Sequence, residues 1–547
     1  MINTKVQLPR FSVGTLFVTI LVSSLLLTAC SNDDTPVIDS PPTAVCSNGV
    51  FIGVQKSHVM AYKGIPYALP PVGALRWKTP VAMADGNNVY DATEFGYVSY
   101  QTKLESEGAS FLPQSEDCLT LNVWHSINGG SEKKPVIVFI HGGDNAWGGS
   151  ADSLYDGYNF VDENPDIVFV SINYRLGYLG FIDLSPLEGG EDYPHSGNLG
   201  LLDQICALQW VHRNIATFGG DPDNVTIMGE SAGGSDVSLL LLVKEAKGLF
   251  HRAIVQSGNV SLTSTKKDDI ELTEAIMEVT GAKSVNDLLA LSGEQLLDVR
   301  TELGEWYNYP ERDGVVLPED ILQTFSATDF TGIDLLIGTN KDEVKYWIVD
   351  INNEDIYNDV VMFTSDYLRK VFEDADKMRY DEFITLVGGD NLASREHFLS
   401  DYVFRVPAIY MAETVSAHGG NAYMYLWTKE SGDPRLGACH AVELPYVFAN
   451  PYYTYVTAGE YDETLARRVR QMWVAFAKTG NPSIEAYPWQ PYDASTRATM
   501  VLGEMTYMEN DPLAARRELI TPLLPYLFSG RFMLIFSNED EVTNQSD

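Results

Sequence analysis

Basic residues are scarce in this sequence of 547 residues. It has 37 lysines and arginines against 75 aspartates and glutamates, which gives a formal net charge of -38. A surface of this charge repels nucleic acid phosphates and gains nothing from counterion release. The composition therefore excludes a nucleic acid partner.

Cysteine is also rare, with five residues in the whole chain. So few cysteines in so large a chain cannot form a disulfide framework of the kind that holds small secreted domains together. None of the spacings between them resembles a zinc site. We therefore expect no structural metal. The cysteines are Cys30, Cys46, Cys118, Cys206 and Cys439.

The sequence lacks internal repeats, and it has no linker between Cys46 and about Tyr526. Hydrophobic residues make up 45% of the chain, enough for a sizeable core. We therefore predict a single domain over residues 46–530, followed by an acidic C-terminal tail over residues 531–547.

Residues 1–29 have the layout of an export signal, since Lys5 and Arg10 precede a long apolar run that begins at Phe11. The end of this segment, "LLTAC", resembles the lipobox of bacterial lipoprotein signal peptides. The resemblance implies cleavage before Cys30 and lipid attachment to its sulfur. The alternative is a retained membrane anchor, because the run is almost long enough to span a bilayer.

If Cys30 is lipidated, residues 30–45 are a polar, proline-bearing tether and several acyl chains hold the protein on a membrane. The expected location is then the cell envelope, and the outer membrane if the host has one.

From about residue 120 onward, short apolar runs alternate with helical patterns, which is typical of parallel strands joined by helices. A helix is expected over residues 201–218, because its apolar residues recur at helical spacing until two glycines, an aspartate and a proline end it. The strands are expected at residues 135–140, 166–174, 224–228, 253–257, 334–338 and 422–427.

Ser231 stands in the sequence Gly229-Glu230-Ser231-Ala232-Gly233, which fits the G-x-S-x-G nucleophile elbow and falls between a predicted strand and a predicted helix. A serine on such a sharp turn needs small neighbours, and the turn points the first N–H groups of the helix toward an oxyanion. The motif alone also occurs in ordinary turns. Its position between strand and helix favours the catalytic interpretation.

A candidate oxyanion loop, "FIHGGDNAWGGS", follows the predicted strand at 135–140 and is similar to the H-G-G-[GA] loop of esterases. Seven further motifs occur along the chain in the same order as in one known protein family. With them the chain resembles the type-B carboxylesterase and cholinesterase family of α/β-hydrolases from residue 46 to about 510. The motifs are "GIPYALPPVGALRW" (64–77), "SEDCLTLNVW" (115–124), "NYRLG" (173–177), "GNLGLLDQ" (197–204), "FGGDPDNVTIMGESAGG" (218–234), "GTNKDE" (338–343) and "GACHAVELPYVF" (437–448).

This resemblance implies an α/β-hydrolase fold, with a large, mostly parallel central sheet flanked by helices and with helical insertions over the active site. It also implies that Ser231 is the nucleophile, Glu343 the triad acid and His440 the base. The order of serine, acid and histidine along the chain is the one expected of α/β-hydrolases. From the residues alone, other candidates remain open: His397 and His418 for the base, and Asp342 for the acid.

The resemblance further assigns the oxyanion donors to the backbone N–H groups of Gly143, Asp144 and Ala232. The family usually has glycine or alanine at the position of Asp144 and an aromatic residue at the position of Asn145. A backbone N–H survives either change. However, a carboxylate at Asp144 would oppose a nearby oxyanion unless it points away, is protonated or is paired.

Three supporting features also follow from the resemblance. Glu230 is either a buried carboxylate that lines the site or a structural residue, Ser257 supports the acid by hydrogen bonding, and Arg76 forms a structural ion pair with Glu116. The family usually bridges Cys118 to a cysteine about twenty residues earlier, where this chain has Ser99. Cys46 is then the alternative partner for Cys118.

The sequence therefore predicts an exported serine carboxylesterase that hydrolyses a small ester through an acyl-enzyme, without a metal or an organic cofactor. One alternative is a non-catalytic adhesion protein on the same fold, although such proteins typically lose a triad residue. A second alternative is a lipase or a polymer-directed esterase. The aromatic residues considered for the substrate pocket are Trp147, Trp427 and Tyr446.

Overall fold

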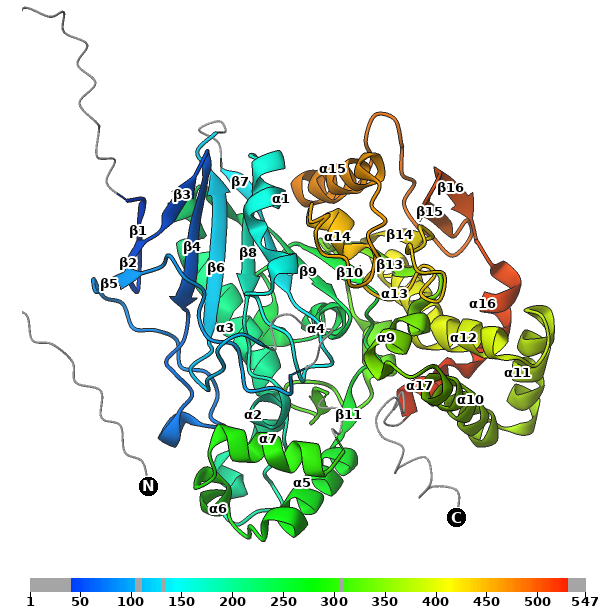
Figure 1. The fold of residues 1–547 in the computed structure, drawn as a ribbon, viewed down its shortest axis with the longest axis horizontal. Helices are drawn as coiled ribbons and strands as arrows, with labels where there is room; N and C mark the ends of the chain where they lie inside the picture. Colours follow the sequence, from blue (N-terminus) through cyan, green and yellow to red (C-terminus); the bar gives the residue numbers. More distant parts are fainter. Residues whose placement is uncertain (1–40, 104–110, 129–132, 305–308, 530–547) are drawn as a thin grey trace, which may run out of the picture. The chain divides into compact units, whose positions relative to one another are not determined.

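The centre of the protein is one mixed sheet of eleven strands, seen in a computed structural model that describes residues 41–103, 111–128, 133–304 and 309–529 (Figure 1). In spatial order the strands are β16 (Thr506–Asn510), β15 (Ala498–Leu502), β14 (Asn421–Trp427), β13 (Asp334–Asn340), β10 (Arg252–Gln256), β9 (Gly220–Glu230), β7 (Lys134–Ile140), β8 (Val168–Ile172), β6 (Thr120–Ser126), β4 (Val59–Pro66) and β3 (Val54–Lys56).

The central strands of this sheet, in spatial order β8, β7, β9, β10, β13, β14 and β15, are parallel to one another. Antiparallel pairs occur only toward the two edges, at β15–β16 and from β8 through β6 and β4 to β3. Every residue of β8 is buried, as expected for a strand covered on both faces. The α/β-hydrolase fold predicted from the sequence therefore has its mostly parallel central sheet.

Two small sheets lie apart from the central one. One consists of β1 (Thr43–Cys46), β2 (Gly49–Ile52) and β5 (Val89–Asp91), and the other of β11 (Ser264–Thr265) and β12 (Glu311–Arg312). Strand β1 begins inside the segment 30–45 that the sequence predicted as a tether, and Ala44 is buried. Residues 43–45 are therefore part of the folded unit, because their alternating side chains pack against β2.

Helices cover the sheet and form two groups beyond it, α5 to α7 at the bottom of Figure 1 and α10 to α12 at its right. The second group belongs to the long crossover between β13 and β14. The helices are α1 (Gly157–Glu163), α2 (Gly177–Gly180), α3 (Leu199–Asn214), α4 (Ala232–Leu240), α5 (Lys266–Thr280), α6 (Val285–Leu289), α7 (Gly293–Glu302), α8 (Ile321–Ala327), α9 (Trp347–Ile351), α10 (Glu354–Val371), α11 (Asp374–Leu386), α12 (Leu392–Ser400), α13 (Val406–Ala417), α14 (Leu444–Val447), α15 (Glu463–Thr479), α16 (Ala514–Ile520) and α17 (Leu524–Ser529).

The predicted helix at 201–218 corresponds to α3 followed by a 3₁₀ turn over Ile215–Phe218. Gly219 ends it with a φ of +79°, a left-handed conformation that glycine adopts without steric cost. The next strand, β9, begins at Gly220 and not at residue 224, because Lys134 of β7 pairs with Gly220 before the register shifts. The other predicted strands lie where the sequence placed them, within a few residues.

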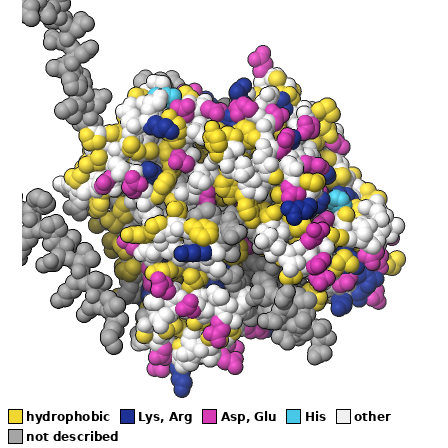
Figure 2. Space-filling view, viewed as in Figure 1, with side chains coloured by type: hydrophobic (Ala, Val, Ile, Leu, Met, Phe, Trp, Pro, Cys, Tyr) yellow, Lys and Arg dark blue, Asp and Glu magenta, His cyan; other side chains and the backbone are white. Residues whose placement is uncertain are grey.

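The predicted signal peptide (residues 1–29), the lipidation site at Cys30 and the acidic tail (residues 531–547) lie outside the described residues. Among the helices that the structure describes, none is both long and apolar enough to cross a membrane. Acidic side chains are spread over the face seen in Figure 2, in keeping with the net charge of the sequence.

Candidate active site

Ser231 occupies a sharp turn between the end of β9 and the start of α4, with φ +57° and ψ −126°. A non-glycine residue rarely adopts this conformation, and strain of this kind clusters at functional sites. The Ser231 N–H donates a 2.9 Å hydrogen bond to the carbonyl of Gln256 on β10, which fixes the turn against the sheet. The structure therefore has the strained serine that the G-x-S-x-G pattern predicts.

The two glycines that flank this serine are needed because backbone atoms crowd them. A Cβ on Gly229 would run into the carbonyl oxygen of Gly233, and a Cβ on Gly233 would run into the carbonyl oxygen of Ile140. Strand β9, helix α4 and the end of β7 can approach one another this closely only without side chains at these positions.

The candidate oxyanion loop leaves β7 at Ile140 and turns back over Ser231. Gly143, Asp144 and Asn145 have φ values of +102°, +50° and +55°. The backbone N–H of Trp147 donates a 2.9 Å hydrogen bond to the carbonyl of Gly143 and so closes the turn. Asp144 and Asn145 can hold the left-handed conformation because their short polar side chains tolerate it better than other side chains do.

A side-chain hydrogen bond fastens this loop to α4. The amide of Asn145 donates to Asp236 Oδ1 at 3.2 Å, and Gln204 of α3 donates to the other carboxylate oxygen. All three side chains are buried. Burial raises the pKa of Asp236 to about 7, and the two hydrogen bonds oppose that increase. Asn145 therefore holds the loop to the helix that follows Ser231.

His440 and Glu343 are joined by a 2.7 Å contact between His440 Nδ1 and Glu343 Oε2. The other oxygen of Glu343 accepts 2.7 Å hydrogen bonds from Ser257 Oγ and from the backbone N–H of Asn340. Glu343 is fully buried and His440 is 4% exposed. The carboxylate is thereby held in one orientation and faces the imidazole, as the sequence predicted for both residues and for Ser257.

The rival candidates lie elsewhere. His418 follows the end of α13 and its Nδ1 lies 2.9 Å from the carbonyl of Thr414, while His397 belongs to α12. Asp342 accepts a 3.1 Å hydrogen bond from the backbone N–H of Ala438, and so supports the loop that carries His440. Of the candidates that the residues alone left open, Glu343 and His440 are thus the two that the structure brings into contact.

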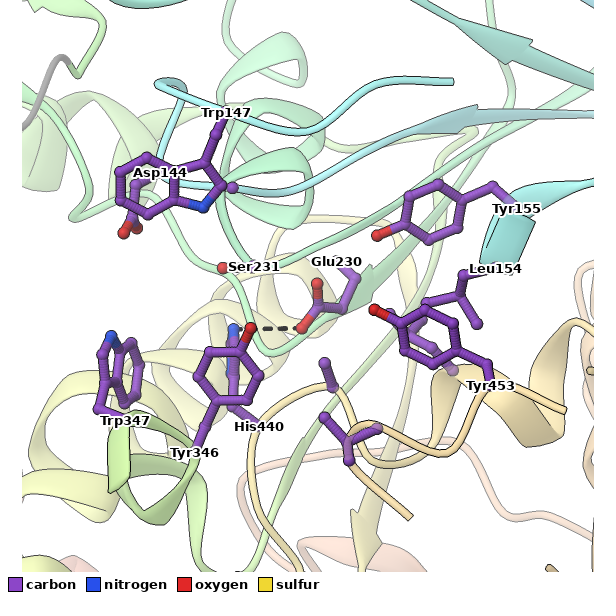
Figure 3. Close-up of a pocket in the computed structure, with 14 residues that line it drawn as sticks. Asp144, Trp147, Leu154, Tyr155, Glu230, Ser231, Tyr346, Trp347, His440 and Tyr453 are labelled. Atoms are coloured by element: carbon purple, nitrogen blue, oxygen red, sulfur yellow. Dashed lines mark ion pairs between the residues drawn. The ribbon is translucent and has the colours of Figure 1, made fainter. Parts of the chain in front are cut away.

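Glu230 lies on the other side of the imidazole, with its Oε1 3.1 Å from His440 Nε2 (Figure 3). Neither of these two atoms has a hydrogen-bond partner of good geometry among the described residues. Ser231 Oγ is therefore not hydrogen-bonded to His440 Nε2 in this structure. Ser231 and His440 line the same pocket, and in Figure 3 Ser231 lies between the oxyanion loop and His440. Glu230 is thus a buried group that lines the site, one of its two predicted roles.

The charges around His440 shift the pKa values of the group. Burial disfavours the imidazolium, but the carboxylates of Glu230, Glu343 and Glu443 outweigh it and raise the pKa of His440 above its usual value. Burial raises the pKa of Glu230 as well, His440 lowers it, and the negative charges of Glu443, Glu343 and Asp144 raise it further. Strongly shifted pKa values in one pocket are typical of catalytic sites.

The pocket around Ser231 has a volume of about 50 Å³ and is lined by Asp144 and Glu230 together with aromatic rings. The ring of Trp347 stacks on His440 with 5.5 Å between centroids. Of the aromatic residues considered from the sequence, Trp147 lines the pocket, whereas Trp427 and Tyr446 do not. The pocket aromatics are Trp147, Tyr155, Tyr346, Trp347 and Tyr453.

Trp427 and Tyr446 are instead buried against each other, with ring centroids 4.9 Å apart. The sequence did not indicate Tyr346, Trp347 or Tyr453 as pocket residues. A usable signal existed for the first two, because they follow Glu343 directly in a short 3₁₀ turn and the helix after it, and so must lie near the acid.

Two other sequence predictions concern structural pairs. Arg76 Nε donates a 2.7 Å hydrogen bond to Glu116, so the predicted ion pair forms. The alternative pairing of Cys118 with Cys46 was wrong, because both are buried free thiols, as are Cys206 and Cys439. No group of histidine, cysteine and acidic side chains that could hold a metal ion occurs in the described part of the chain.

A sharp serine turn at the carboxyl end of a central strand, a buried Glu–His pair and a facing glycine loop together define a serine hydrolase site on an α/β-hydrolase sheet. Residues 40–519 match the carboxylesterase family. The chain belongs to this family, and its relatives include carboxylic ester hydrolases.

Among its relatives is the para-nitrobenzyl esterase of Bacillus subtilis (strain 168), which is 36% identical over 87% of this chain and 97% of its own length. Human cocaine esterase is 31% identical over 84% of this chain and 86% of its own length. A solved structure of a PNB esterase has a TM-score of 0.78 and 34% identity, and covers 88% of this chain and 99% of that one.

A carboxylesterase from Geobacillus stearothermophilus has a TM-score of 0.75 at 32% identity, over 87% of this chain and 99% of its own. The likeness thus extends over most of the chain.

Proposed function

We propose that the protein hydrolyses carboxylic esters with Ser231 as nucleophile, His440 as general base and acid, and Glu343 as the group that orients His440. The contact of 2.7 Å between Glu343 and His440 Nδ1, beside a serine on a strained turn, carries this proposal. Because Glu343 fixes the proton on Nδ1, Nε2 is left to accept the proton of Ser231.

The reaction then runs in two halves. Ser231 Oγ attacks the ester carbonyl as its proton passes to His440 Nε2, and the tetrahedral oxyanion accepts hydrogen bonds from the N–H groups of Gly143, Asp144 and Ala232. His440 returns the proton to the leaving alcohol, and an acyl-enzyme remains. Water, activated by His440, releases the acid. The carboxylate of Glu230 stabilises the transient imidazolium, since it lies 3.1 Å from Nε2.

Small esters with an aryl or short alkyl group are the proposed substrates, because the pocket is small and its walls include aromatic rings and aliphatic side chains. A panel of aryl and alkyl esters of increasing acyl length tests this proposal on the purified protein and on Ser231→Ala. We expect turnover of the short esters by the wild type and a loss of at least about a thousandfold in Ser231→Ala.

Two results would contradict the proposed function. A clear preference for long acyl chains would favour a lipase. Absence of turnover, together with failure of a serine-reactive phosphonate to label Ser231 in folded protein, would favour the non-catalytic binding protein.

The proposed cellular location rests on the sequence alone. We propose that the chain is cleaved before Cys30, that the sulfur of Cys30 is lipidated, and that the lipid anchors the enzyme in the cell envelope. Detergent phase partition of the full chain expressed in a bacterial host tests it. We expect the wild type in the detergent phase and Cys30→Ser in the aqueous phase. Equal partition of the two proteins would exclude the lipid anchor.

A further inference from the structure

Arg300, on α7, is a buried guanidinium without a counter-charge in the described part of the chain. The residue is 2% exposed. Its Nε, Nη1 and Nη2 atoms are all buried, and no described group accepts a hydrogen bond from any of them. A guanidinium stays protonated in proteins and carries five N–H donors, so its charge and its donors both need partners.

Other buried arginines of this protein have such partners. Arg175 donates to both oxygens of Asp203, Arg470 to Glu163 and Arg516 to Asp401. An arginine buried without its carboxylate strongly destabilises the folded state, because the desolvated charge is not compensated. Arg300 therefore differs from these three, because no described residue accepts a hydrogen bond from it although it is buried as well.

A small cavity adjoins Arg300, between α7 and the short helix α2. Its volume is about 20 Å³, which is enough for one group of the size of a water molecule or a halide ion. Apart from Arg300, the walls are backbone and mostly apolar side chains, among them Leu176, Gly177, Leu296 and Leu297. No carboxylate of the described residues lines this cavity, so it suits an anion and not a cation.

We propose that this cavity binds one small monovalent anion of the halide class against the Arg300 guanidinium. A single negative charge neutralises the arginine, and a monoatomic anion accepts several N–H donors at once without demanding a fixed geometry. Oxyanions such as sulfate or phosphate are too large for the cavity, and a second negative charge would itself remain uncompensated among apolar walls.

The site lies directly behind the oxyanion loop. The Arg300 guanidinium carbon is 5.7 Å from the centroid of the Trp147 ring, and Trp147 both lines the catalytic pocket and closes the turn at Gly143 through its backbone N–H. An anion on Arg300 therefore stabilises the side chain on which Trp147 packs. Because the ion does not touch the substrate pocket, binding is measurable without any ester.

Thermal unfolding tests the proposal. The purified protein is heated in sodium bromide and in sodium gluconate of equal ionic strength, since gluconate is too large for the cavity. We expect the apparent Tm to rise with bromide and to level off as the site fills. The same series on Arg300→Met should show no specific effect of bromide, and Arg213→Met, which removes an exposed arginine of α3, should behave as the wild type.

A bromide-soaked crystal provides a second, direct measurement, in which we expect an anomalous peak beside Arg300. If Arg300→Met does not fold, Arg300→Lys replaces it, with the bromide effect retained at higher concentrations. Equal Tm values in bromide and gluconate for the wild type, or an equal bromide effect in Arg300→Met, would overturn the proposal.

Discussion

The side-chain amide of Asn145 donates a 3.2 Å hydrogen bond to Asp236, across 91 residues of sequence. One partner belongs to the loop that faces Ser231 and the other to the helix that begins just after it. The two sets of backbone donors proposed for the oxyanion are therefore connected by a buried side-chain contact as well as through the sheet. We expect their spacing to depend on this bond.

Removal of that bond should reduce turnover more than substrate binding. In Asn145→Gly the backbone keeps a residue that tolerates the φ of +55°, while the Asp236 carboxylate loses one of its two donors. We expect kcat to fall about tenfold with KM nearly unchanged, and the free energy of unfolding to drop by about 1–3 kcal/mol. Ester kinetics and urea unfolding measure the two effects. Unchanged kcat would mean that the bond does not position the loop.

Glu230→Gln should shift the pH dependence of the reaction. The carboxylate next to Nε2 raises the pKa of His440, and the reaction needs the neutral imidazole. Activity therefore rises as the pH passes the pKa of His440, and removal of the negative charge should move that midpoint to lower pH. The pH profile of kcat/KM measures this shift, with the exposed Glu94→Gln as control. A shift to higher pH would contradict the prediction.

Asp144→Asn should increase the rate with neutral esters. Asparagine keeps the backbone N–H and tolerates the φ of +50°, but removes a charge that lies in the pocket and contributes to the raised pKa of Glu230. Loss of a negative charge from the pocket in which the oxyanion develops should favour the transition state, so kcat should rise by up to about tenfold. Asp144→Gly should behave in the same way. If kcat and substrate preference stay the same in both variants, Asp144 does not influence the reaction.

Ser257 should matter through Glu343 alone. Its hydroxyl donates a 2.7 Å hydrogen bond to the carboxylate, and its φ of +48° makes glycine the appropriate replacement. In Ser257→Gly, Glu343 retains the N–H of Asn340 and the ring of His440. We therefore expect kcat to decrease about tenfold, without a change in KM. A complete loss of activity would place Ser257 closer to the chemistry than its contacts indicate.

Reducing agents should leave the protein unaffected, because Cys46, Cys118, Cys206 and Cys439 are free thiols in the core. We expect the same Tm with and without dithiothreitol. A thiol reagent should label these four residues only after unfolding. Loss of stability on reduction would reveal a disulfide and contradict the structure.

Sequence patterns located the central strands and the serine turn because both depend on local physical requirements. A run of β-branched residues such as those of β8 has few alternatives to a buried strand, and the glycines around Ser231 have a steric reason that the structure makes visible. The family motifs then supplied Glu343 and His440, which local reasoning could not distinguish from Asp342, His397 and His418.

The residues that line the pocket could not be predicted from the sequence, for a different reason. The direction of a side chain at the end of a strand or in a loop depends on neighbours from distant segments, so the motif around Trp427 could not show that its ring packs on Tyr446 in the core. The bond from Asn145 to Asp236 and the packing of Arg300 against Trp147 depend likewise on residues far apart in the chain. Such relationships appear only in three dimensions.

The residues between Glu343 and His440, which stand 97 positions apart in the chain, have a consequence for biosynthesis. They include helices α9 to α13 and strand β14, so the ribosome makes Ser231, the oxyanion loop and the acid long before the base. A growing or truncated chain that ends just before residue 440 contains every strand of the central sheet except β15 and β16, yet it lacks the residue proposed to take the proton of the serine. The complete hydrolase therefore arises only when synthesis of the chain is nearly finished.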